Sequence, residues 1–178
     1  WDDNPPAISL TGPLREPLII ALRAGLASDD IALRSFASHY LDRLGCFDDS
    51  VAEAALVCLH EEFGDGPTRV YWGDPLSKSD WECLAVGSRL GAARVLIGRG
   101  LQTEPIKMLT HFLAQPVENS SDHSIRALRL LVECGTEQTR VREVAARYLA
   151  LWRVPSFYFQ KMVPLLQRSC VPDPLLRA

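Results

Sequence analysis

The side chains of this 178-residue chain that could do chemistry are scattered rather than grouped. His60-Glu61 begins an H-E-x-x-H zinc motif, but Gly64 stands where the second histidine is required. The five cysteines form no C-x-x-C pair and so lack the short spacing of zinc ligands. The sequence also lacks a phosphate-binding glycine loop and a G-x-S-x-G nucleophile motif. We therefore expect neither catalytic residues nor a bound metal or cofactor.

The segment 64–78 and the start of the helix expected after it hold the side chains best suited to binding. The candidate binding residues are Arg69, Tyr71, Trp72, Asp74 and Trp81. Long connections on regular scaffolds carry function more often than helix bodies do. Because Tyr, Trp and Arg are enriched at binding hot spots, this cluster is predicted to contact a protein partner. The alternative is that Trp72 and Trp81 fold back and close the segment onto the helices.

The elements that must position these residues are helices, because apolar residues recur every three or four positions and strand-like alternation is nearly absent. Capping residues and glycine stops delimit about eight helices. We expect them at about 14–27, 29–44, 49–63, 80–98, 104–114, 122–134, 137–152 and 156–169. Ser28 or Asp29 is expected to cap the second helix, and Gly45 to end it. Three glycines in the fourth helix predict close packing of a neighbour there: Gly87, Gly91 and Gly98.

Residues 14–45 resemble a HEAT repeat. The positions that carry the resemblance are Pro17, Leu18, Ala21, Leu22, Leu26, Leu33-Arg34, Ala37, Leu41 and Leu44-Gly45. A partial second copy lies near 137–152, in Val141-Arg142, Ala145 and Leu149. The resemblance implies that Asp30 and Arg34 belong to a ladder between successive hairpins, and that Arg142 does so in the partial copy.

The resemblance also implies the architecture and the function. It implies an all-α, right-handed α-solenoid of about eight antiparallel helices, forming one domain over residues 1–178. Such a solenoid is expected to be a protein-interaction module or scaffold without catalytic activity. A compact, non-repeating helical bundle is the alternative fold. One HEAT-repeat enzyme, deoxyhypusine hydroxylase, binds two irons through several His-Glu pairs, whereas this chain has a single such pair.

The charge distribution bears on the kind of partner. Residues 1–66 hold an excess of acids, whereas residues 120–178 hold an excess of bases that includes six arginines between 126 and 153. Some HEAT-like proteins are DNA glycosylases, so an enzyme or binder acting on nucleic acid is the alternative function. The sequence pI of about 5.8 and the absence of a lysine-aromatic stripe argue against it. We therefore expect a protein partner.

Two further expectations concern the setting of the protein. No apolar run reaches the roughly 20 residues that cross a bilayer, so no membrane partner is expected. The odd number of scattered cysteines is typical of a reducing compartment and predicts a cytoplasmic location. The start at Trp1, with neither a methionine nor a signal peptide, predicts a fragment or a processed part of a longer chain.

The binding prediction for the 64–78 segment is tested by Trp72→Ala. We expect the variant to bind its protein partner more weakly, because an aromatic anchor is lost, while its melting temperature stays nearly unchanged. Partner affinity and thermal unfolding are measured on the same preparations. Unaltered binding with a large loss of thermal stability would instead assign Trp72 to the closure of the segment.

Overall fold

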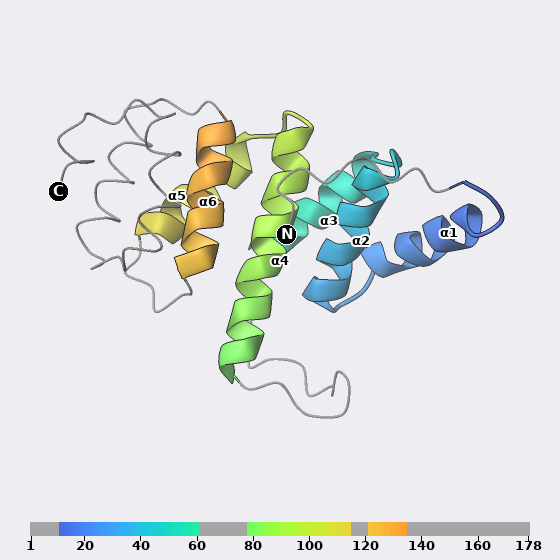
Figure 1. The fold of residues 1–178 in the computed structure, drawn as a ribbon, viewed down its shortest axis with the longest axis horizontal. Helices are drawn as coiled ribbons and strands as arrows, with labels where there is room; N and C mark the ends of the chain where they lie inside the picture. Colours follow the sequence, from blue (N-terminus) through green and yellow to red (C-terminus); the bar gives the residue numbers. More distant parts are fainter. Residues whose placement is uncertain (1–10, 61–77, 115–120, 135–178) are drawn as a thin grey trace. The chain divides into compact units, whose positions relative to one another are not determined.

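The computed structural model of the chain describes residues 11–60, 78–114 and 121–134, which form six α-helices and no strand (Figure 1). The helices are α1 (Arg15–Leu26), α2 (Ile31–Arg43), α3 (Asp49–His60), α4 (Lys78–Gly98), α5 (Thr103–Ala114) and α6 (Ser121–Glu133). The all-α prediction is therefore confirmed for these residues, and each helix lies within a few residues of its expected bounds. The helices expected at 137–152 and 156–169 lie outside the described residues. None of the helices described is both long enough and apolar enough to span a bilayer.

The chain divides into two compact units, Trp1–Gly100 and Leu101–Ala178. The first, unit 1, contains α1 to α4, and the second, unit 2, contains α5 and α6. Within unit 1, α2 packs against α1, α3 and α4, whereas α1 and α3 touch each other only slightly (Figure 1). The second helix is therefore the central element of unit 1.

Both ends of α2 are fixed by local hydrogen bonds. The Asp30 carboxylate accepts from the backbone N–H groups of Ala32 (2.9 Å) and Leu33 (3.3 Å), which have no partner inside the helix. Asp30, rather than Ser28 or Asp29, is thus the N-cap, and the expectation for the cap was wrong by one residue. The reason is that the Ser28 hydroxyl accepts from the Asp30 N–H (3.1 Å) and closes the turn before the helix.

The C-terminal end of α2 is closed as its sequence predicts. Gly45 has a φ of +73°, a conformation that costs glycine little because it has no Cβ. The N–H of Cys46 donates to the carbonyl of Leu41 (2.8 Å), and that of Gly45 donates to Asp42 (3.0 Å). This pair of bonds is a Schellman motif, which satisfies carbonyls that the end of the helix leaves open and turns the chain toward α3.

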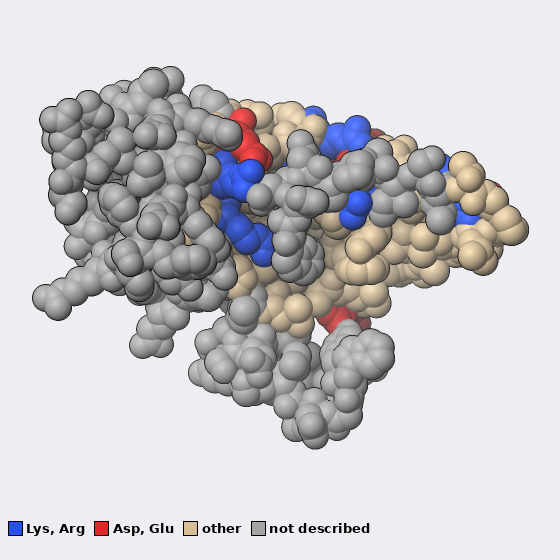
Figure 2. All heavy atoms as spheres, viewed as in Figure 1, with Lys and Arg blue, Asp and Glu red and all other residues tan. Residues whose placement is uncertain are grey.

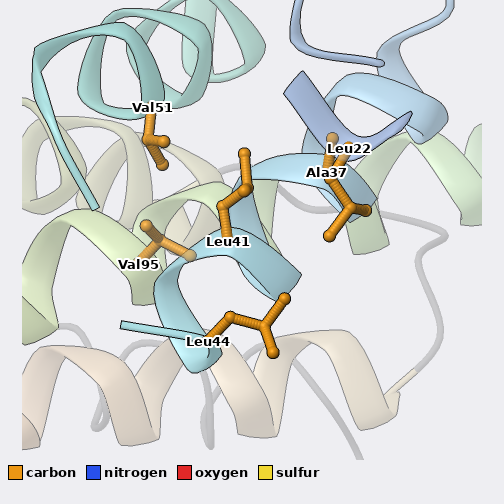
Figure 3. Close-up of a cluster of buried hydrophobic side chains, with 6 residues drawn as sticks. All are labelled: Leu22, Ala37, Leu41, Leu44, Val51 and Val95. Carbon is orange, nitrogen blue, oxygen red and sulfur yellow. The ribbon is translucent and has the colours of Figure 1, made fainter. Parts of the chain in front are cut away.

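Leu41 lies at the centre of the core of unit 1. It is fully buried, and it clusters with side chains from all four helices: Leu22, Ala37, Leu44, Val51 and Val95 (Figure 3). Partly buried apolar residues, Ile19, Leu26, Tyr40, Cys46 and Phe47, surround this cluster. Burial of one face of α2 therefore joins α1, α3 and α4, because each contributes at least one side chain to the same cluster.

Small residues let α2 and α4 approach closely. The buried Ser35 hydroxyl donates to the carbonyl of Ser88 (2.9 Å), and a Cβ at Gly91 would lie 3.1 Å from the Ser35 oxygen. Close packing is thus confirmed at Gly91. At Gly98 the expectation was wrong, since a Cβ there would meet nothing within 4 Å. The two helices run in the same direction, because Ser35 near the start of α2 pairs with Ser88 in the middle of α4, and Asp42 near the end of α2 pairs with Arg99 just after α4.

Unit 2 is described through α5 and α6, which pack against each other. Their buried apolar side chains are Leu109, Leu113, Ala127, Leu128, Leu130 and Leu131. Cys134 follows α6 and is half-buried, and burial raises the pKa of its thiol to about 11. A thiol with so high a pKa is almost entirely protonated at neutral pH, so it is a poor nucleophile.

Candidate protein-binding face

The side of α2 that faces away from the core carries apolar and aromatic residues instead of a polar surface. Leu33 is 44% exposed and Phe36 is 51% exposed, while Tyr40 and Arg43 are half-buried. Their spacing of three, four and three residues places all four on one side of the helix. We call this set, Leu33, Phe36, Tyr40 and Arg43, the outer stripe of α2.

The aromatic members of the outer stripe hold one another in place. The ring centroids of Phe36 and Tyr40 are 4.3 Å apart, and His39 meets Tyr40 edge-on at 5.5 Å. The guanidinium carbon of Arg43 lies 5.8 Å from the Tyr40 centroid, at the outer limit of a cation–π contact. Tyr40 in turn packs against the buried core cluster. The exposed rings are therefore anchored to a rigid helix, and ordering them on binding costs little entropy.

The outer stripe lies beside α1. A Cβ at Gly25 would lie 3.1 Å from the Cβ of Ala37 and 3.7 Å from the Cγ of Leu33, so α1 passes close beside Leu33. Leu18, seven residues before Gly25, is on the same side of α1 and is 39% exposed. On the face shown in Figure 2, the α1 end of unit 1 is mostly uncharged, with isolated Lys and Arg side chains. Few charged side chains therefore lie on that face at the α1 end of unit 1.

An ion pair holds α1 to the beginning of α3. Arg23 contacts both carboxylate oxygens of Asp48, at 2.8 and 2.6 Å, and also donates to the Ser50 hydroxyl (2.7 Å) and the Cys46 carbonyl (3.1 Å). Asp48 accepts in addition from the Val51 N–H (3.1 Å), as the cap of α3. The Arg23 guanidinium and the Ser50 hydroxyl hold the pKa of Asp48 well below its ordinary value. This pair fixes the angle at which α1 lies beside α2.

A second ion pair joins the ends of α2 and α4. The Nε of Arg99 donates to the Asp42 carboxylate (2.6 Å), and its guanidinium carbon lies 5.0 Å from the ring centroid of Phe47. Phe47 belongs to the connection between α2 and α3, so this arginine at the end of α4 contacts both α2 and the connection that follows it. Exposed pairs of this kind each contribute little to stability, but they fix the register of packed helices.

The structure brings together few of the residues that the sequence singled out. Arg69, Tyr71, Trp72, Asp74 and Arg142 lie outside the described residues. Trp81 belongs to α4, and its side chain lies outside the description. The binding role of these residues therefore stays a prediction.

The two remaining ladder residues, Asp30 and Arg34, are both at the start of α2. Arg34 is buried, and it donates through Nε (3.0 Å) and Nη2 (2.5 Å) to the carbonyl of Ser28. Together with the capping bonds of Asp30, these contacts stabilise the turn between α1 and α2. A ladder from one hairpin to the next stays a prediction.

The outer stripe was not predicted from the sequence, because Leu33 was assigned to the repeat, and Phe36 and Tyr40 match no motif that would single them out. The sequence of α2 nevertheless contains a signal for this surface. Apolar residues on α2 cover more of its circumference than one packed face needs, because Ile31, Ala37 and Leu41 already supply the buried side. An excess of this kind predicts either another packed neighbour or a binding surface.

Among the residues that the structure describes, no three His, Cys, Asp or Glu side chains come together in a way that could hold a metal ion. His60 is exposed at the last position of α3.

Comparison with protein-family models, with curated proteins and with solved structures gave no match. The function of this protein is therefore inferred from the outer stripe of α2.

The ion pair between Arg23 and Asp48 predicts a specific pH dependence. Because the pKa of Asp48 is lowered in the folded state, its stabilising contribution is present above the unfolded pKa of about 3.9 and is lost as the pH falls further. We expect Asp48→Asn to lower the free energy of unfolding near neutral pH and to lose less of it on acidification. Urea unfolding at about pH 6 and about pH 3 measures both effects.

Glu53→Gln, which removes an exposed carboxylate from α3, controls for the general loss of negative charge. An equal loss of stability on acidification in the wild type and in Asp48→Asn would contradict the assignment.

Proposed function

We infer that this protein is an interaction module that binds another protein and has no catalytic activity of its own. The observation that carries the proposal is the outer stripe of α2, together with the adjoining surface of α1. Leu33 and Phe36 are both exposed and neighbour each other on α2, and adjoining exposed apolar side chains, unlike a single one, indicate an interaction site. Phe36 is held rigidly by Tyr40, as expected of a binding anchor.

The composition of the outer stripe fits a protein partner. Phe, Tyr and Arg are among the residues enriched at protein interfaces, and the stripe combines all three within eight residues of α2. A surface that binds nucleic acid needs several Lys or Arg side chains to neutralise phosphates, whereas the stripe contains one basic residue, Arg43. Of the arginines that raised the nucleic-acid alternative, Arg126 and Arg129 are half-buried on α6, and Arg129 pairs with Glu133. The others lie outside the described residues.

A HEAT-like solenoid is the architecture that we propose for the module. Two features of unit 1 support it: α1 with α2 and α3 with α4 are consecutive packed helix pairs, and α2 runs parallel to α4 as its neighbour. Second helices of stacked hairpins pack in this way, and a stack of hairpins exposes an apolar edge at its open end. The right-handed twist, the full set of about eight helices and the ladder of Asp30, Arg34 and Arg142 are parts of the same proposal.

The proposal is tested with Phe36→Ser and a matched control. Val57 is also an exposed apolar residue of a helix, at 46%, but it lies on α3 and outside the stripe. Each variant is used as bait in a cell lysate, and captured proteins are quantified against the wild type. We expect Phe36→Ser to lower capture about tenfold, the loss typical of a removed aromatic anchor, and Val57→Ser to leave capture unchanged.

Equal capture by the wild type and Phe36→Ser would sink the proposal that the outer stripe binds protein. Equal loss in both variants would indicate nonspecific adhesion of exposed apolar residues. Capture of nucleic acid that falls steeply with salt, in place of protein, would favour the alternative function.

A further inference from the structure

We draw no further inference here: the strongest candidate, the exposed apolar face that Leu33 and Phe36 form on α2, belongs to the surface already described, and nothing in the part of the chain that the structure describes shows what covers it.

Discussion

Burial of the inner face of α2 is the interaction on which the rest of unit 1 depends. Leu41 and Ala37 are fully buried in one cluster with side chains of α1, α3 and α4, so the three helices are joined through α2. Apolar burial is the largest favourable contribution to folding, and here it is concentrated on one element. The polar contacts around it, Asp30 at the start of α2 and the Schellman motif at Gly45, set where that element begins and ends.

The ion pairs help to position the helices of unit 1 but contribute little to its stability. Arg23 with Asp48 and Arg99 with Asp42 are partly exposed, so water screens them and their contribution to stability is small. Their value is geometric, since each arginine links the end of one helix to the start or end of another. With α2 held on its inner side and fixed at both ends, its outer side exposes Leu33 and Phe36, while Tyr40 packs at the edge of the core. An aromatic stripe on such a rigid support is suited to binding.

Local rules made the helices predictable from the sequence, but they did not determine which helix side faces water. Capping residues, glycine stops and three-four spacing depend on neighbours in the chain, and the bounds of α1 to α6 follow from them. Whether Phe36 is buried depends on what packs against α2 from elsewhere, which spacing alone does not encode. The same holds at Gly91 and Gly98, which look alike in sequence, because only Gly91 meets another helix. The sequence predicted a binding site at the aromatic residues within 69–81. The outer stripe is recognised only from the exposure of Leu33 and Phe36 in the structure.

The central claim is that the two sides of α2 have separate roles, and the urea unfolding free energies of Leu41→Ala and Phe36→Ala test it most directly. Leu41→Ala should lose about 2–5 kcal/mol, because it leaves a cavity where four helices meet. Phe36→Ala, an equally drastic truncation one turn away, should lose no more than about 1 kcal/mol, because half of the ring is already in water. Comparable losses in the two variants would contradict the account, since Phe36 would then belong to the core and not to a binding surface.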